Sequence, residues 1–284
     1  MGSQAAKIFE TTQNYLQTIV APQAAKIAKN PETLKQVLKG LGERNLLALK
    51  IPQNLGGAGL TEQDYSKFQV LITRYSGALA FLQTQHQSAG SMIGSSENIE
   101  LKQNYLPYIS RGEKLVGVGF SQLRRSGNPM MKAQRVEKGY LLAGEVPWIT
   151  GWDFFDSFII GATLPDGKEL YGMLPLHNQE QAKGGTINLS QPMNLIGMNS
   201  TNTVAASIKE WFLEDNRVIA IKPAGSIHKK SQKNVLHHGF FAVGCAQAAL
   251  DILKISYEKK QLSFIQESRY DLQNELDNCY QQML

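Results

Sequence analysis

The chain has 284 residues, of which 42% are hydrophobic and 19% charged. This composition is typical of a soluble globular protein of about one to three domains and excludes a disordered chain. The net charge of +5 is small for this length, and the basic residues are dispersed. Because nucleic-acid-binding proteins carry a concentrated basic stripe, we expect no nucleic-acid partner. No apolar run approaches the ~20 residues needed to cross a bilayer, so we expect no membrane span.

The N-terminal sequence lacks the basic and apolar regions of a secretory signal, which favours a cytoplasmic protein. The two cysteines, Cys245 and Cys279, lie in helix-like sequence. We expect buried or half-buried thiols in a reducing compartment and no disulfide framework. The sequence indicates no metal site.

Residues 1–112 are predicted to be mainly helical, forming an N-terminal helical domain. Leucines recur there at helical spacing, at Leu34, Leu38 and Leu41. The glycines of "IPQNLGGAGL", residues 51–60, interrupt the helical pattern. Thr61 follows and is predicted to cap the next helix, with Asp64 three residues further on.

Residues 113–227 change to short apolar or alternating runs such as "KLVGVGFS" and "DSFIIGATL". Glycine-containing turns separate them, at 138–139, 166–167 and 184–185. This pattern predicts a compact antiparallel sheet domain, a β-barrel or sandwich.

Residues 228–284 return to a helical pattern and form a partial C-terminal helical domain, with a second helix expected from about Glu267 to the end. An apolar stripe marks the first helix, at Val235, Leu236, Phe240, Val243, Leu250 and Leu253. The order helices, strands, helices predicts an α+β fold. Two helices cannot complete a four-helix bundle, so their apolar faces must cover the barrel, the N-terminal helices or another subunit.

The segment "PWITG", residues 147–151, permits two interpretations. It is either a core strand or the wall of a flavin site, which needs a flat apolar neighbour and a hydrogen-bond donor near the reactive ring nitrogen. Trp148 and Thr150 are two residues apart on the predicted strand, so both should project to one face. Gly151 allows a sharp bend beside a cofactor.

Several segments in order resemble the acyl-CoA dehydrogenase family. "GLGERNLLALKIPQNLGGAGL" is similar to the family's glycine-rich segment, and "QNYLPYISRGEKLVGVGF" to its entry into the β-barrel. "GYLLAGEVPWITG", "IGMNSTNTVAASI" and "VGCAQAALDI" follow in the family's order, so the resemblance covers roughly residues 40–260. It implies a helical domain, a β-barrel and a helical bundle, together with FAD as cofactor and an acyl-CoA or other small molecule as substrate.

The resemblance also implies cofactor-binding residues. Trp148 and Thr150 match the flavin-contacting pair of the family's "WIT" segment, and Phe120 and Ser121 match a second flavin-contacting segment. Ser121 keeps a hydroxyl group there; the alternative is a hydroxyl bonded within its own strand.

Other positions depart from the family pattern. The loop after Ser121 is shortened to "RRSGNPMM", where Arg124 and Arg125 either meet an anionic phosphate or form a solvated turn. Asn199 and Lys260 stand where the family has arginines, and a lysine lacks the bidentate guanidinium.

The general base of the reaction is the largest departure, because removal of an α-proton needs a placed carboxylate. The position at which some members carry it is Asn234, and Val235 follows in place of an arginine. Asp251 lies 17 residues along the helix, about 25 Å away at ~1.5 Å per residue. His237 and His238 are alternatives as acid or base, or surface histidines. The catalytic residues therefore remain unknown.

Three functions stay open: an active flavin oxidoreductase acting on the CH–CH bond of acyl thioesters, an impaired relative that binds FAD or acyl-CoA without turnover, and a scaffold subunit. A flavin-dependent monooxygenase of the same fold is a variant of the first, since it needs no α-proton base. In each case the exposed helix faces predict a homo-oligomer or a partner chain.

Overall fold

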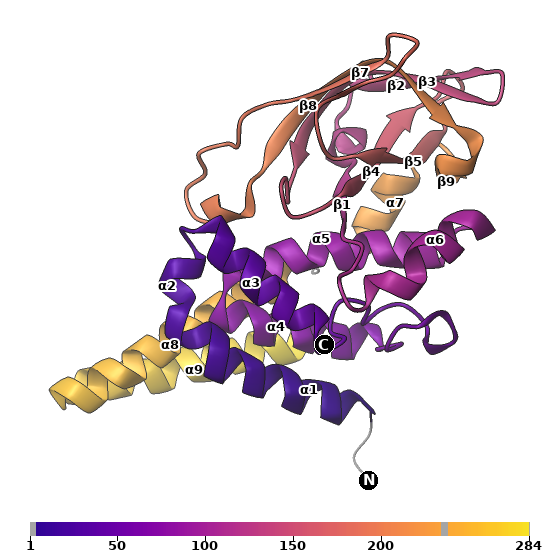
Figure 1. Ribbon diagram of the computed structural model, residues 1–284. Helices are drawn as coiled ribbons and strands as arrows, with labels where there is room; N and C mark the ends of the chain where they lie inside the picture. The colour runs from indigo at the N-terminus through magenta and orange to yellow at the C-terminus, as the bar shows by residue number, and fades with distance from the viewer. Residues whose placement is uncertain (1–3, 234–237, 284) are drawn as a thin grey trace.

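Helices form the first part of the chain in the computed structural model, which describes residues 4–233 and 238–283 (Figure 1). The α-helices of this part are α1 (Gln4–Tyr15), α2 (Ala24–Ile27), α3 (Pro31–Gly42), α4 (Glu62–Tyr75), α5 (Gly77–Gly94) and α6 (Ile99–Ile109). The predicted cap of α4 is confirmed, because the hydroxyl of Thr61 accepts a hydrogen bond from the backbone N–H of Asp64 at 3.1 Å. The side chains of Asn30, Ser76 and Asn98 cap α3, α5 and α6 in the same way.

A mixed sheet follows the helices. Its strands are β1 (Val116–Gly119), β2 (Met131–Val136), β3 (Gly139–Ile149), β4 (Ser157–Thr163), β5 (Glu169–Pro175), β6 (Gln179–Glu180), β7 (Thr186–Leu189), β8 (Val204–Glu214) and β9 (Val218–Lys222). The predicted turns at 138–139, 166–167 and 184–185 each lie between antiparallel neighbours, the pairs β2–β3, β4–β5 and β6–β7.

The predicted closed antiparallel barrel is wrong. The strands follow the order β6-β7-β8-β3-β2-β4-β5-β9, and no pairing between described residues joins the edge strands β6 and β9. In addition, β1 and β2 both pair with β4 in parallel. Alternating hydrophobicity indicates that a segment is a strand, but it does not indicate the neighbour or its direction. The α+β class itself is confirmed.

Helix α5 joins the helical part to the sheet. Its His86 is fully buried, and its Nδ1 accepts a hydrogen bond from the N–H of Val116 in β1 at 3.0 Å. The Nε2 atom lies 3.2 Å from the carbonyl oxygen of Ile109 at the end of α6, and donates to it in the tautomer that this pair of partners requires. Burial lowers the pKa of His86 to about 4. One neutral imidazole thus connects three elements.

The chain ends in α7 (Ser226–Lys233) and two long helices, α8 (Gly239–Lys260) and α9 (Ser263–Met283). Helix α8 packs against α4: a Cβ on Gly244 would lie 2.6 Å from Cβ of Thr73, so only glycine allows this approach. Arg74 of α4 also forms a bidentate ion pair with Asp251, with both N–O distances 2.6 Å. Gly244 and Asp251 therefore hold one side of α8 against the N-terminal helix α4.

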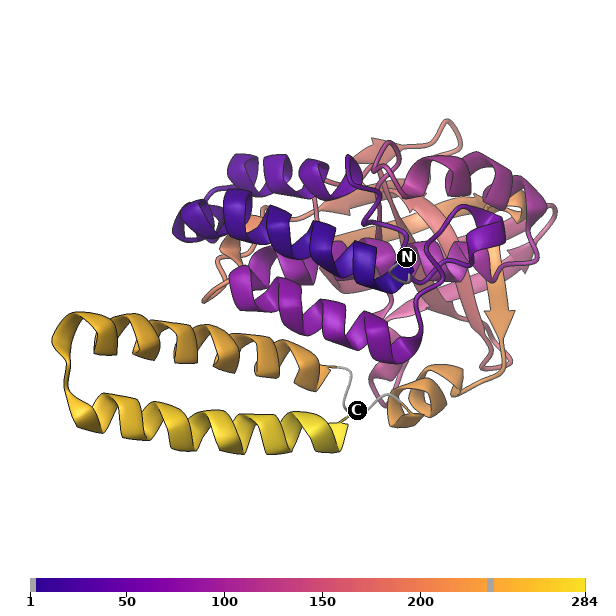
Figure 2. The ribbon, with the colours of Figure 1, turned by 90° about the horizontal axis from the view of Figure 1, so that it is seen from below.

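The α8–α9 hairpin projects beyond the rest of the molecule (Figures 1 and 2). Large apolar side chains are exposed along it: Ile252, Ile255, Leu262, Phe264, Tyr270 and Leu272. Cys245 and Cys279 are exposed as well, so the expectation of buried thiols is wrong. Within the described part of the chain, α8 alone is long and apolar enough to cross a membrane, which is weak evidence for a span. The domain boundaries after residues 112 and 227 stay predictions.

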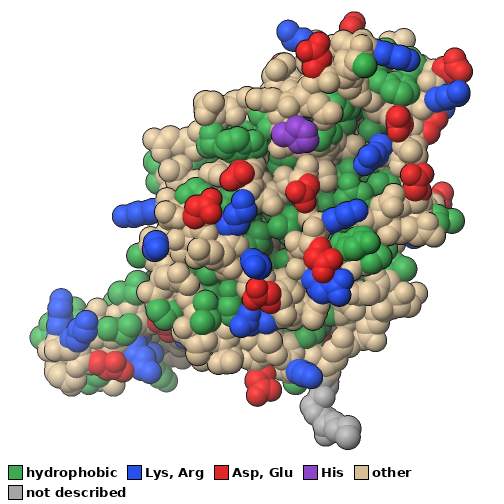
Figure 3. Space-filling model, viewed as in Figure 1, with side chains coloured by type: hydrophobic (Ala, Val, Ile, Leu, Met, Phe, Trp, Pro, Cys, Tyr) green, Lys and Arg blue, Asp and Glu red, His purple; other side chains and the backbone are tan. Residues whose placement is uncertain are grey.

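Acidic and basic side chains intermingle with apolar ones over the face shown in Figure 3. No charge of one sign dominates this face.

Candidate functional site

The ends of β1 and β3 lie side by side, and the residues predicted to contact a flavin follow β1 or lie at the end of β3. A Cβ on Gly119 would lie 3.0 Å from Cγ1 of Ile149, and one on Gly117 would lie 3.3 Å from the carbonyl oxygen of Thr150. A short 3-10 helix, η4 (Ser121–Arg124), follows β1 directly and contacts β3. The glycines of "VGVG" therefore allow the backbone before Phe120 to approach the end of the "PWIT" segment.

Ser121 carries a buried hydroxyl group without a hydrogen-bond partner. The next side chain, Gln122, is held by two bonds from its amide nitrogen, to the carbonyl oxygens of Gly119 at 3.1 Å and Gly161 at 2.7 Å. Buried polar atoms in folded proteins are nearly always bonded, so an unpaired hydroxyl needs an explanation. The Oε1 atom of Gln122 is also buried without a partner, so two neighbouring polar atoms are left for a ligand or a water molecule to bond. The alternative, a hydroxyl bonded within its own strand, does not hold.

Thr150 is buried, and its hydroxyl lies 3.0 Å from the hydroxyl of Thr203. In such a pair one hydroxyl donates to the other, and the accepting one keeps its own proton free to donate. The backbone around the pair is fixed because the N–H of Gly151 donates to the carbonyl oxygen of Thr201 at 2.9 Å. The two threonines thus offer one hydrogen-bond donor at a fixed place.

Trp148 is 46% exposed, whereas the neighbouring Ile149 is fully buried. The indole is therefore not part of the core, and the interpretation of "PWITG" as an ordinary core strand fails for this residue. The strand periodicity predicted that Trp148 and Thr150 would project to one face, but Trp148 is exposed and Thr150 is buried. The pairing of β3 with β8 shifts its register between Val146 and Ile149, and Gly151 follows with φ +99°. This irregularity interrupts the simple alternation.

Phe120 is half-buried and meets the ring of Tyr171 edge to face, with centroids 5.7 Å apart. The hydroxyl of Tyr171 donates to Oε2 of Glu169 at 2.8 Å, and burial together with Glu169 raises the pKa of Tyr171. Glu169 is only 4% exposed, and its oxygens accept the N–H of Ile227 at 3.1 and 3.2 Å. Sequence reasoning missed this buried carboxylate. The two-residue spacing of Glu169 and Tyr171 on one strand face was the available signal.

Comparison with known families matches residues 3–113 to the N-terminal domain of acyl-CoA dehydrogenases. This N-terminal part of the chain belongs to the acyl-CoA dehydrogenase family. The mitochondrial isovaleryl-CoA dehydrogenase of Solanum tuberosum is 25% identical over 266 residues, covering 90% of this chain and 63% of that protein. The 3-(aryl)acrylate reductase of Clostridium sporogenes is 23% identical, covering 90% of this chain and 69% of that protein. This chain thus spans less than two thirds of the plant enzyme.

Solved structures show the same fold. The glutaryl-CoA dehydrogenase of Mycobacterium smegmatis matches with a TM-score of 0.81 at 17% identity, over 100% of this chain and 75% of that one. A second structure of a glutaryl-CoA dehydrogenase from that organism, in complex with FADH2, matches with a TM-score of 0.78 at 18% identity, over 97% of this chain and 73% of that one. Members of the acyl-CoA dehydrogenase family are FAD-dependent flavoproteins.

Positions that depart from the family pattern have other tasks in this chain. Asn199 accepts a hydrogen bond from the N–H of Leu195 through its side-chain oxygen at 3.1 Å. Lys260 ends α8 at the tip of the hairpin and is exposed. Asp251, the carboxylate judged too distant for the reaction, is bound by Arg74.

The predicted region of the general base is only partly described. Asn234, Val235 and His237 lie outside the described residues. His238 precedes α8, and its ring stacks near that of Phe241 with centroids 6.3 Å apart. No catalytic residue is assigned. The described residues also hold no group of three or more His, Cys, Asp or Glu able to bind a metal ion.

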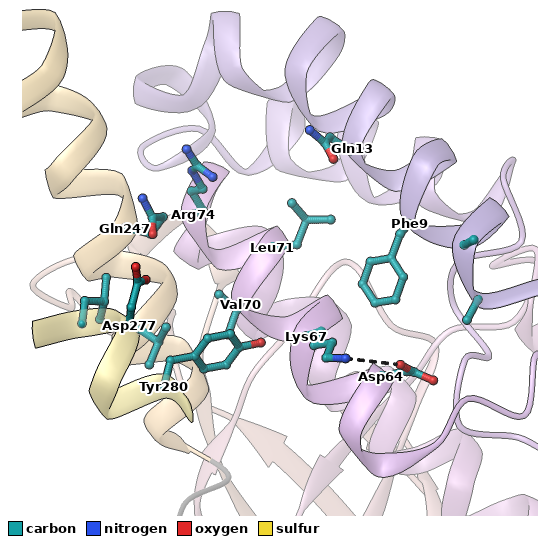
Figure 4. A pocket seen from close by; sticks show the side chains of 14 residues that line it. Phe9, Gln13, Asp64, Lys67, Val70, Leu71, Arg74, Gln247, Asp277 and Tyr280 are labelled. Carbon is teal, nitrogen blue, oxygen red and sulfur yellow. Dashed lines mark ion pairs between the residues drawn. The ribbon is translucent and has the colours of Figure 1, made fainter. Parts of the chain in front are cut away.

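A groove of about 590 Å³ lies away from this site, between α1, α4, α8 and α9 (Figure 4). Phe9, Leu71 and Tyr280 give it apolar walls, and the ion pair between Lys67 and Asp64, 4.0 Å apart, lies on α4 at its edge. None of the four predicted flavin-contacting residues lines it.

Proposed function

We propose that this chain binds FAD between the turn at Phe120–Ser121 and the segment Trp148–Thr150. The observation that carries the proposal is the buried, unpartnered hydroxyl of Ser121 beside the end of β3. The exposed indole of Trp148 and the hydroxyl pair of Thr150 and Thr203 support it. A flat apolar surface and two nearby hydrogen-bond donors are the features that a flavin ring requires.

Each residue has a defined role in this proposal. Ser121 and Thr150 donate hydrogen bonds to heteroatoms of the flavin, and the indole of Trp148 covers part of its ring. Phe120 forms an apolar edge, held in place by Tyr171. When bound, the flavin supplies two-electron oxidation and reduction chemistry.

We further propose an acyl-CoA dehydrogenase-like oxidoreductase whose ligand is an acyl thioester and whose turnover is slow. Family membership supports the ligand class, and Asn234 at a family base position supports slow turnover. Without a carboxylate of raised pKa, removal of the α-proton loses a contribution of roughly 10²–10⁴-fold. The proposed setting is the cytoplasm.

Two spectroscopic experiments test the proposal. Purified protein titrated with FAD should quench flavin fluorescence and retain a visible absorption band through gel filtration. Anaerobic mixing of the flavin-loaded protein with acyl-CoAs of several chain lengths should bleach that band slowly. A protein that leaves FAD free refutes the flavin proposal, whereas rapid bleaching refutes the proposed lack of a base. Flavin bleached by NADH but by no acyl-CoA would favour the monooxygenase alternative.

The exposed hairpin supports a further part of the proposal, that a second copy or a partner chain covers α8 and α9. Six large apolar side chains are exposed on these helices or the turn between them. Large apolar side chains exposed together on one hairpin are typical of protein–protein contacts. A scaffold role without bound flavin is the alternative that this observation favours, and the FAD titration separates the two.

A further inference from the structure

Cationic side chains from several elements converge around the short helix α7. They are Lys50 from the segment after α3, Arg124 from η4, Lys222 from β9 and Lys230 from α7. Partial desolvation lowers the pKa of Lys230, and next in size come the positive charges of Lys222 and Lys50. Glu62 opposes this shift and raises the pKa of Lys230, and Arg124 makes the smallest contribution and lowers it. Since charges affect one another strongly only at short range, these four groups share one neighbourhood.

Hydrogen bonds and ring contacts hold this arrangement. The Nε–H of Arg124 donates to Oγ of Ser231 at 3.1 Å, and that hydroxyl donates to the carbonyl oxygen of Ile227 at 2.9 Å. The Nζ atom of Lys222 lies 5.5 Å from the centroid of the Tyr171 ring. Arg124 and Lys222 therefore come from different elements, η4 and β9, and both lie near α7.

Two carboxylates lie near these cations, and both already have partners within the protein. Glu62 pairs with Lys50 at 2.8 Å, and buried Glu169 accepts hydrogen bonds from the N–H of Ile227 and the hydroxyl of Tyr171. None of the ion pairs within residues 4–233 and 238–283 uses Arg124, Lys222 or Lys230. The four cations outnumber the two nearby carboxylates, Glu62 and Glu169, so this neighbourhood keeps a net positive charge, which favours the binding of an anion.

We propose that Arg124, Lys222 and Lys230 form a binding site for the phosphate groups of a nucleotide ligand. Guanidinium and ammonium groups are the side chains that bind phosphate oxygens in proteins, through charge-assisted hydrogen bonds. The cluster surrounds one short helix and does not form a stripe, which favours a small ligand over a nucleic acid. Sequence analysis left Arg124 and Arg125 between a phosphate contact and a solvated turn, and the arrangement around α7 favours the phosphate contact for Arg124.

The position of the cluster gives the ligand class. The proposal rests on the proposed function, because FAD and CoA thioesters both carry a pyrophosphate. Arg124 ends the same turn that Ser121 begins, and Phe120 contacts the Tyr171 ring over which Lys222 lies. The cluster therefore adjoins the turn at which Ser121 is proposed to contact the nucleotide.

Calorimetric titration with inorganic pyrophosphate at low and at physiological salt tests the site. The variants are Lys222→Gln and Lys230→Gln, and Lys209→Gln serves as control because Lys209 is an exposed lysine of β8 away from the cluster. We expect each cluster variant to bind pyrophosphate about tenfold more weakly, the loss of roughly one charge-assisted hydrogen bond. The control should bind like the unmodified protein. Absence of pyrophosphate binding, or equal binding by all variants, would overturn the proposal.

Thermal unfolding without ligand shows that the variants fold. Lys230→Gln removes a charge crowded by other cations, so its melting temperature should equal or exceed that of the unmodified protein. Weak pyrophosphate binding by such a stable variant then reports the loss of the site and not of the fold.

Two further ligands identify the source of the phosphates. Pyrophosphate that competes with FAD assigns the site to the flavin nucleotide, whereas adenosine 3′,5′-bisphosphate that binds together with FAD assigns it to a CoA thioester. Pyrophosphate bound through Lys222 and Lys230 by a protein that does not bind FAD would refute the proposed function and support this site. If all variants bind FAD equally and none binds pyrophosphate, this phosphate site is refuted and the proposed function is supported.

Discussion

The pH dependence of folding should be dominated near neutrality by His86. Burial lowers its pKa in the folded protein to about 4, whereas the unfolded chain has the ordinary value of 6.5. The folded state therefore holds the imidazole neutral while the unfolded state takes up a proton as the pH falls below 6.5. Stability contributed by the neutral ring is complete above that pH and decreases toward the folded pKa. Integration gives a loss of about 2 kcal/mol by pH 5 and about 3 kcal/mol by pH 4.

Urea unfolding between pH 7 and pH 5 measures this effect as a difference between variants. His86→Gln removes the titrating group, and His177→Gln, at an exposed position, is the matched control. At pH 7 the His86 variant should be less stable, because glutamine loses the ring contact with Phe155 and must order a flexible side chain to reach Val116 and Ile109. The difference in free energy of unfolding between the two proteins should narrow by about 2 kcal/mol at pH 5. Parallel stability curves for the unmodified protein and His86→Gln would refute the reasoning.

The structure supports three further predictions. Asp251→Asn should lower the free energy of unfolding by roughly 1 kcal/mol in urea titrations, because it breaks the half-exposed bidentate pair with Arg74, whereas exposed Asp271→Asn should have no effect. Gly151→Ala should lower the free energy of unfolding by about 1–3 kcal/mol more than Gly184→Ala. Both positions have positive φ, but only a Cβ at Gly151 would lie 2.4 Å from the Phe155 ring. Equal losses of stability in thermal unfolding would contradict this. Ile255→Glu and Phe264→Glu should reduce self-association measured by light scattering, with Glu267→Gln as control; a monomeric unmodified protein would exclude the second copy.

Local signals in the sequence predicted those parts of the fold that depend on neighbouring residues. Thr61 and Asp64 identify a helix start because the capping bond spans only three residues. The glycine turns identify hairpins for a similar reason. The parallel pairing of β1 with β4 has no local signal, since it joins segments about 40 residues apart. For this reason the helix and strand segments were predictable and the open mixed sheet was not.

The candidate site shows the same limit. The motif "PWITG" indicated Trp148 and Thr150, but its periodicity could not indicate that one would be exposed and the other buried. Ser121 was identified through family resemblance, while its lack of a partner is a property of the packed structure alone. Glu169 bonds Ile227, which lies 58 residues away, so nothing in either local sequence predicts the contact.

The affinity of the protein for FAD, compared between the unmodified chain and Ser121→Ala, tests the central claim most directly. Removing a buried hydroxyl that has no protein partner should leave the free energy of unfolding unchanged or slightly higher. The same change should weaken FAD binding about tenfold in a fluorescence titration, the loss of roughly one hydrogen bond. Ser207→Ala, at a sheet position whose hydroxyl bonds Glu145, should bind FAD normally. Equal FAD affinity in all three proteins, or no binding in any, would contradict a flavin site at Ser121.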